Sequence, residues 1–346
     1  MTYLVVLVVL LIFLNVSLLI YLLVSKHLTQ IREKQKREIE AEILQAVEEI
    51  IKGKMAKIPK LFKRNRLFYE VLEETLSHFI LLFNSEETIT ILRKIAEDEL
   101  TTRYQSQLKK GKWSKRMNVL YYIEDFEMSS LQDSLWKYYK NRKHSEAEKH
   151  QVIRTLSTLR DERILKEIKR SPDWPYFLLK ECFRRFGLAF LHELIYHSLS
   201  ELTEEVQVAL LDVVIEAKDH TAGPLFDALL FSSSLEIRIR ALKAIYLFGS
   251  SQKGNELLSF QHSEHWVERM FFARIAGKLK KQRYSQALIQ LLSDANWWVR
   301  QAAAESLSKY EDGLLLLEYV YATSKDQFAR DTSSQWLGEA VGQNDK

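Results

Sequence analysis

The sequence predicts an all-α protein, and two observations carry that prediction. Only 4 Pro and 10 Gly occur in 346 residues, whereas Leu, Glu and Lys are prominent. So few residues that break helices or form tight turns favour helices over a sheet protein. In addition, a pattern of helical spacing recurs about every 31 residues in the C-terminal half. With 47% hydrophobic residues, the chain has enough apolar material for one elongated or two compact domains.

The first element is an uncharged apolar run from Leu4 to Val24, which is long enough to cross a bilayer as a helix. A hydrocarbon core about 30 Å thick needs roughly 20 apolar residues at a rise of 1.5 Å each. A cleaved signal peptide is the alternative, but no basic residue precedes the run and no small-x-small cleavage site follows Val24. We therefore predict a retained transmembrane helix in residues 1–25.

The basic residues that flank the run predict its orientation. None precedes it, whereas five follow it closely: Lys26, Arg32, Lys34, Lys36 and Arg37. Because basic flanks stay on the cytoplasmic side, we expect a single-pass membrane protein with its N-terminus outside and its C-terminal body in the cytoplasm. The single cysteine, Cys182, agrees with a reducing compartment, since it cannot form an intrachain disulfide.

Residues 26–66 are expected to form a juxtamembrane helix followed by a basic segment. Apolar residues repeat at helical spacing from Ile39 to Ile50, and Gly53 follows as a helix stop. The basic residues of the segment, with no acid among them, are Lys52, Lys54, Lys57, Lys60, Lys63, Arg64 and Arg66. Two interpretations stay open for them: contact with anionic lipid headgroups, or a solvated face of the first repeat helices, since Pro59 interrupts any long amphipathic helix.

Four segments of the C-terminal half share one pattern, an apolar residue and then Arg, followed by small or apolar residues three and four positions later. They are residues 233–249, 263–279, 294–310 and 325–341. Their arginines are Arg238, Arg269, Arg300 and Arg330. A period of about 31 residues is the size of a two-helix repeat, so residues 201–341 are expected to stack as an α-solenoid.

The third copy carries Asp294, Val299, Arg300, Ala303 and Leu307, and in these residues it resembles the HEAT-repeat family. The resemblance implies helix pairs that pack on their neighbours in a superhelix, with the arginines laddered to aspartates, as Arg300 would be to Asp294. The second copy departs from the pattern at Phe272, where a small residue belongs. Residues 67–200 show similar patterning without the small residues, which predicts degenerate helical repeats there.

No catalytic motif accompanies this architecture. His192 and His197 resemble a zincin pair, but their spacing places the two imidazoles about 140° apart on a helix, so they cannot share one metal ion. Cys182 lies among apolar residues and is interpreted as a core residue. No phosphate-binding glycine loop or nucleophile elbow occurs. We therefore expect no enzyme activity, no metal site and no cofactor.

Tryptophan is concentrated in the C-terminal repeats, at Trp266, Trp297, Trp298 and Trp336. Exposed aromatic residues are favoured anchors of protein interfaces, so these are the candidate partner-binding residues. Plain packing within the repeats is the alternative. Adjacent Trp297 and Trp298 point about 100° apart on a helix, which suggests one core residue and one exposed residue.

These observations together favour a membrane-anchored scaffold that holds a protein partner at the cytoplasmic face. The expected partner is itself membrane-associated, such as an envelope or polysaccharide-synthesis enzyme or a signalling complex. One rival is an enzyme of the HEAT fold, of the metal-dependent hydroxylase or lyase type. A nucleic-acid-binding solenoid is the other, and it is disfavoured because the net charge is only +4. It would require Lys109, Lys110, Lys112, Lys115 and Arg116 to continue as a basic stripe.

Overall fold

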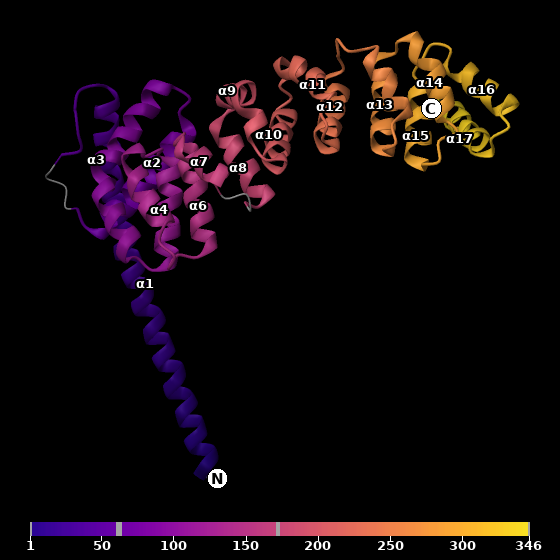
Figure 1. Ribbon diagram of the computed structural model, residues 1–346. Coiled ribbons are helices and arrows are strands. Elements are labelled where there is room, and N and C mark those ends of the chain that lie inside the picture. The colour runs from indigo at the N-terminus through magenta and orange to yellow at the C-terminus, as the bar shows by residue number, and fades with distance from the viewer. Residues whose placement is uncertain (1, 60–63, 171–173, 345–346) are drawn as a thin grey trace. The chain divides into compact units, whose positions relative to one another are not determined.

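A computed structural model describes residues 2–59, 64–170 and 174–344 (Figure 1). These residues form helices and loops with no strand, which confirms the predicted all-α fold for this part of the chain. The chain divides into two compact units, residues 1–164 and residues 165–346. The domain boundaries predicted at residues 66 and 200 differ from this division and stay predictions.

Helices and short loops build the first unit. Its elements are α1 (Thr2–Ile51), α2 (Arg66–Leu82), α3 (Glu86–Lys110), α4 (Trp113–Asp125), the 3₁₀ helix η1 (Ser129–Leu131), α5 (Gln132–Tyr139) and α6 (Glu146–Thr158). Helix α7 (Arg163–Arg170) follows at the division between the units.

The second unit continues as helix pairs. Its elements are α8 (Tyr176–Phe186), α9 (Leu188–Ser198), η2 (Leu199–Glu201), α10 (Glu204–Glu216), η3 (His220–Ala222), α11 (Gly223–Leu229), α12 (Leu235–Phe248), η4 (Glu256–His262), α13 (Trp266–Leu279), η5 (Gln282–Tyr284), α14 (Ser285–Leu291), α15 (Trp297–Leu307), α16 (Gly313–Thr323) and α17 (Gln327–Asn344).

Helix α1 is a single uninterrupted helix that runs from the apolar segment into the core of the first unit. Its C-terminal part buries Ile43, Val47 and Ile50, the residues of the predicted stripe, against α2 and α3. Gly53 then adopts a left-handed backbone with φ +72°, which a residue with a Cβ rarely adopts, and the helix ends there as predicted.

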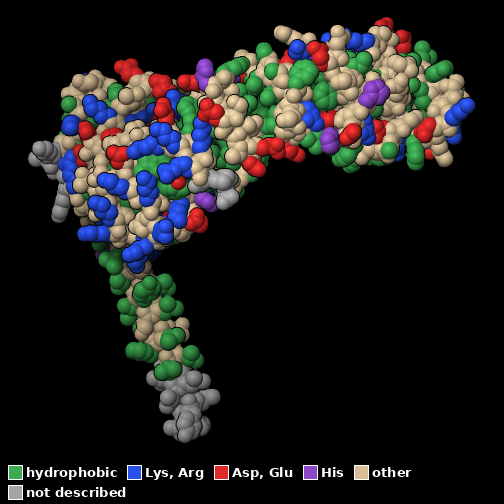
Figure 2. All heavy atoms as spheres, in the orientation of Figure 1, with side chains coloured by type: hydrophobic (Ala, Val, Ile, Leu, Met, Phe, Trp, Pro, Cys, Tyr) green, Lys and Arg blue, Asp and Glu red, His purple; other side chains and the backbone are tan. Residues whose placement is uncertain are grey.

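The N-terminal part of α1 has no protein neighbours that bury it. Every side chain from residue 10 to residue 24 is exposed, and Figure 2 shows hydrophobic side chains covering this part of the helix. By length and composition α1 could cross a membrane, and it is the only helix in the described ranges of which this is true. A signal sequence near an N-terminus has the same properties.

In the second unit the second helices of successive repeats lie side by side. Helices α13 and α15 approach closely at Gly277, where an added Cβ would lie 2.5 Å from the side chain of Ser306. Buried Ala273 and Ala303 keep the rest of this interface narrow. Tyr310 then ties the pair together, because its hydroxyl donates to the carbonyl of Ala276 at 2.9 Å. Small residues thus set the spacing of these repeats.

Phe272, which departs from the repeat pattern, is fully buried. Its ring meets the ring of Tyr284 edge to face, with centroids 5.7 Å apart. The Tyr284 hydroxyl in turn donates to the carbonyl of Gly254 at 2.6 Å. The larger side chain is accommodated because Phe272 faces the first helix of the next repeat, where an aromatic pair fills the core.

A buried carboxylate holds together three helix ends of the first unit. Glu148, only 1% exposed, accepts hydrogen bonds from Arg116, from Tyr138 and from the backbone and hydroxyl of Ser145. Burial alone would raise the pKa of Glu148, but these hydrogen bonds outweigh it and lower that pKa to about 2.

We predict that Glu148→Gln destabilises the protein by about 3 kcal/mol at neutral pH, because the shift from about 4.5 to about 2 favours the folded state. In the native protein this contribution is complete above about pH 4.5 and is lost as the pH falls towards about 2. Urea unfolding at several pH values measures both effects. The matched control is Glu146→Gln, an exposed glutamate on the same turn, which should cost less than about 1 kcal/mol. Equal losses in the two variants would contradict the assignment.

Candidate protein-binding surface

The four periodic arginines all make the same local contact. In each, the Nη1 atom donates to backbone carbonyls five or six residues earlier, in the loop that precedes its helix. The bonds are Arg238 to Ser232 and Ser233, Arg269 to Ser263 and Glu264, Arg300 to Asp294 and Ala295, and Arg330 to Ser324, at 2.7–3.2 Å. We call this contact the arginine clamp. It fixes the loop against the first turn of the second helix in each of these four repeats.

Two of the clamps also reach the following repeat. The Arg238 guanidinium binds the buried carboxylate of Glu268, and Arg269 binds Asp294 through two hydrogen bonds of 2.6 and 2.9 Å. The expected side-chain pair between Asp294 and Arg300 is wrong, because Arg269 occupies that carboxylate and Arg300 takes the Asp294 carbonyl instead. Arg300 lies over the Phe328 ring at 4.5 Å. The clamps therefore set the register between repeats.

The clamped helix starts carry exposed tryptophans. Trp266 begins α13 and Trp297 begins α15, so each stands three residues before a clamp arginine. Trp266 is 40% exposed, Trp297 50% and Trp298 55%, and the rings of Trp297 and Trp298 meet edge to face at 4.7 Å. The expectation that one of the adjacent pair lies in the core is wrong. Both stay outside because the first turn of α15 extends past the buried interface that begins at Val299.

Phe328 is a further exposed aromatic residue at the start of a clamped helix, in the last repeat, and the sequence analysis did not identify it. It is 57% exposed and precedes Arg330 by two positions, as Trp298 precedes Arg300. Aligning the repeats on their arginines would have revealed it. Trp336, in contrast, is half-buried, and its indole N–H donates to Gln301 at 2.9 Å. The candidate surface, which we call the aromatic row, therefore comprises Trp266, Trp297, Trp298 and Phe328.

A second exposed apolar surface lies on α16. Leu315 is 65% exposed, Tyr319 62% and Tyr321 51%. Apart from Glu318, the side chains of α16 are mostly apolar, which is typical of a buried helix, so the sequence alone does not reveal these exposed residues. Nothing in the described residues covers these side chains.

The predicted membrane-surface segment is largely engaged within the first unit. Lys52 pairs with Glu48, Lys54 with Glu49, and Lys57 with Asp98. Arg66 is exposed at the start of α2, and Lys60 and Lys63 lie outside the described residues. The segment also begins beyond the far end of α1, about 40 Å along the helix from Val24. Lys52 and Lys54, at the end of α1, therefore lie far from the apolar run, and lipid contact by the whole segment stays a prediction.

Arg64, from the same segment, has a structural role. Its guanidinium donates to the carbonyls of Pro59 and Ile58 and pairs with Glu99 at 2.9 Å. This is an arginine clamp like those of the C-terminal repeats. Arg116 repeats it, donating to the carbonyl of Gly111 at 2.8 Å and to the Glu148 carboxylate. The clamp thus extends to the first unit, where the sequence shows no period.

His192 and His197 have different surroundings on α9. His192 pairs with Asp219 of the next helix pair, whereas Glu193 and His197 are exposed on the surface of α9. Asp219 also accepts a hydrogen bond from the Thr221 hydroxyl, so its environment is that of a structural acid. In the part of the chain that the structure describes, no three His, Cys, Asp or Glu side chains gather as they would around a metal ion. Cys182 is fully buried, as expected of a core residue.

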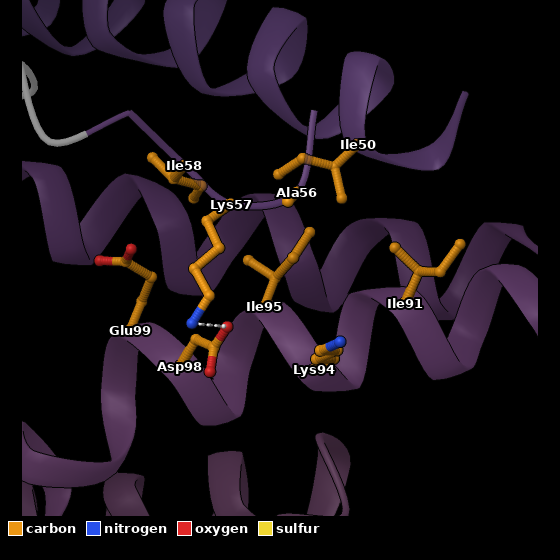
Figure 3. A pocket seen from close by; sticks show the side chains of 9 residues that line it. All are labelled: Ile50, Ala56, Lys57, Ile58, Ile91, Lys94, Ile95, Asp98 and Glu99. Atoms are coloured by element: carbon orange, nitrogen blue, oxygen red, sulfur yellow. Dashed lines mark ion pairs between the residues drawn. The ribbon is translucent and has the colours of Figure 1, made fainter. Parts of the chain in front are cut away.

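A small pocket lies where the end of α1 meets α3 (Figure 3). Its volume is about 120 Å³, and the side chains of Ile50, Ile58 and Ile95 form its apolar walls. The Lys57 ammonium reaches across it to Asp98 at 3.1 Å. Sites for small-molecule ligands usually enclose about 300 Å³ or more, so this pocket is too small for a typical substrate.

A family model described as HEAT repeats matches residues 254–337, which include the three clamps at Arg269, Arg300 and Arg330. No curated protein matches the chain. Among solved structures, human deoxyhypusine hydroxylase in complex with glycerol is 18% identical, with 71% of this chain and 96% of that chain covered, at a TM-score of 0.29. An engineered protein is 14% identical, with 80% of each chain covered, at a TM-score of 0.34.

We predict that the aromatic row contributes little to folding. Trp297→Ala or Trp298→Ala should change the free energy of unfolding by about 1 kcal/mol or less, since each side chain is half in solvent. The control is Phe272→Ala, a buried aromatic of the same repeats, which should cost about 3–5 kcal/mol. Urea titration followed by circular dichroism compares them. Losses as large as that of Phe272→Ala would mean that the tryptophans serve the core.

Proposed function

We propose that this protein is a membrane-anchored HEAT-repeat scaffold that binds a protein partner at the cytoplasmic face of a membrane. The observation that carries the proposal is the aromatic row: three exposed tryptophans and a phenylalanine on the starts of α13, α15 and α17. Large exposed aromatic side chains cost solubility, and on repeat proteins such surfaces are commonly binding sites.

The arginine clamps make the aromatic row suited to binding. They hold each helix start against its preceding loop, so the tryptophans are presented on rigid backbone. A preorganised surface loses less conformational freedom on association. Tryptophan is also among the side chains that dominate binding energy at protein interfaces. We therefore infer that the partner inserts into the row with apolar side chains of its own.

The anchor proposal rests on α1. Its apolar part is exposed from residue 10 to residue 24, and basic residues follow it closely, which favours a cytoplasmic body. A scaffold held at a membrane meets other membrane-associated proteins at high local concentration. We therefore place the partner among membrane-associated components, such as an envelope or polysaccharide-synthesis enzyme or a signalling complex.

Site-specific photocrosslinking tests the partner site. A photoreactive phenylalanine analogue at position 266 or 298 should capture one partner from intact cells, whereas the same analogue at Tyr196 should not. Tyr196 is the matched control because it is an aromatic residue of the same unit, 59% exposed and outside the row. Replacement of Trp298 by Ala should also weaken binding by about 2 kcal/mol, or roughly thirtyfold. Equal capture from position 196, or none from 266 and 298, would reject the proposal.

Fractionation tests the anchor. The full chain should stay with membranes in alkaline carbonate, and deletion of residues 1–25 should release a soluble helical protein, because the buried part of α1 begins only near residue 39. A reporter fused after Lys346 should be active in the cytoplasm. A secreted reporter would reverse the orientation, and a cleaved N-terminus would identify a signal peptide.

A further inference from the structure

One end of the first unit is strongly basic. Residues 105–118 and 134–145 contain no Asp or Glu. Together they carry eight exposed basic side chains: Lys109, Lys110, Lys112, Lys115, Lys137, Lys140, Arg142 and Lys143. No ion pair involves any of them within the described residues, unlike the lysines that follow α1. This group, which we call the basic end, therefore keeps its charge available to a partner.

The fold brings these two segments together through Arg116. Its guanidinium donates to the Gly111 carbonyl after α3, to the Tyr138 hydroxyl at the end of α5, and to Glu148 in the first turn of α6. The side chain of Arg116 therefore faces inward and joins the helix ends. The neighbouring lysines remain outside, so the basic stripe predicted to include Arg116 consists of the lysines without it.

The basic end is hollowed by a groove of about 460 Å³. Its polar lining side chains, which come from both acid-free segments, are Gln105, Lys109, Ser134, Lys137, Asn141 and His144. Ammonium, amide and hydroxyl donors of this kind suit a phosphate group, and the volume is that of a small ligand or headgroup. The groove is thus a recess for an anionic headgroup within a positive surface.

Contacts with α1 fix where the basic end lies. Arg32 of α1 binds Glu70, and four residues later Lys36 binds Glu74, so α1 and α2 run in the same direction. Helix α3 returns beside α2, with Arg103 over the Tyr69 ring at 4.4 Å. It then continues for seven more residues to Lys110. Because α3 runs back towards the N-terminal part of α1, Lys110 lies near the level of the apolar run.

Distances along α1 place Lys110 and its neighbours near the membrane surface. Arg32 is eight residues beyond Val24, about 12 Å at 1.5 Å per residue. Seven residues of α3 span about 10 Å in the opposite direction, which brings the lysines close to the headgroup layer. Figure 2 shows Lys and Arg side chains gathered on the body where the apolar part of α1 leaves it. Trp113, 53% exposed among the lysines, is a residue typical of membrane interfaces.

We propose that the basic end binds the anionic phospholipid headgroups of the membrane that α1 enters. This inference rests on the proposed membrane anchor. Electrostatic attraction to acidic lipids acts within about a Debye length of the surface, roughly 8 Å at physiological salt, and the basic end lies within that reach. The first unit is then held at the membrane by two contacts, α1 and the basic end, which restricts its rotation.

Lysine acetylation of the full chain in nanodiscs tests the proposal. Discs of phosphatidylcholine alone are compared with discs that also contain phosphatidylglycerol, and mass spectrometry reports the reactivity of each lysine. We expect the reactivity of Lys109, Lys110 and Lys137 to fall about threefold or more in the anionic discs, and about 1 M salt to restore it. Lys278, Lys309 and Lys325 of the second unit, all exposed, should react equally in both discs.

Charge variants complete the test. The triple change Lys109→Gln, Lys110→Gln and Lys112→Gln should weaken lipid binding, so that Lys137 and Lys143 regain their reactivity towards acetylation in anionic discs. The matched triple change at Lys278, Lys309 and Lys325 should leave their protection intact. Equal reactivity of the basic end in both discs, with the protein retained, would overturn the proposal. Protection in neutral discs by added RNA but not by anionic lipid would assign the surface to nucleic acid instead. Loss of the protein from every disc would indicate failure of the anchor itself.

Discussion

The first unit is built around one continuous helix, α1. One helix carries both the exposed apolar run and the buried residues Ile43 and Val47, so no loop separates the proposed membrane segment from the first unit. Ion pairs to Glu70 and Glu74 fix α2 alongside it. Any orientation that α1 takes in a bilayer is therefore passed on to the helices packed against it. A flexible tether would only raise local concentration, whereas a continuous helix in a bilayer would also decide which end of the first unit faces the lipid.

The arginine clamp plays the corresponding part in the repeats. A guanidinium that bonds the loop before its own helix satisfies backbone carbonyls that would otherwise lie unpaired beside a turn. Where it also reaches an acid of the next repeat, as Arg269 reaches Asp294, it fixes the register between neighbours. Arg64 and Arg116 make the same local contact within the first unit, although they are 52 residues apart. The aromatic row of the second unit thus stands on clamped helix starts.

The sequence predicts the helical class, the repeats and the buried stripe of α1, because each depends on the spacing of apolar and small residues along a single helix. It did not predict properties that depend on contacts between helices. Trp298 was ambiguous because helical phase cannot tell whether a first turn extends past its neighbour. The acid that pairs with Arg269 lies 25 residues away and belongs to the next repeat. The many basic residues after α1 suggest a free positive surface, yet Lys57 is paired with Asp98, a residue far from it in the sequence. The lysines near Arg116 cluster only because the start of α4 meets the ends of α3 and α5.

We propose that α1 holds the repeats at a membrane, whereas the repeats alone determine which partner binds. Replacing residues 4–24 by an unrelated apolar transmembrane sequence, with residues 25–346 unchanged, separates these two roles. Partner recovery by crosslinking in cells is the measurement, with deletion of residues 1–25 alongside. We expect full partner recovery with the replaced helix and a strong loss with the deletion. Loss of the partner with the replaced helix, or unchanged recovery after deletion, would contradict this proposal.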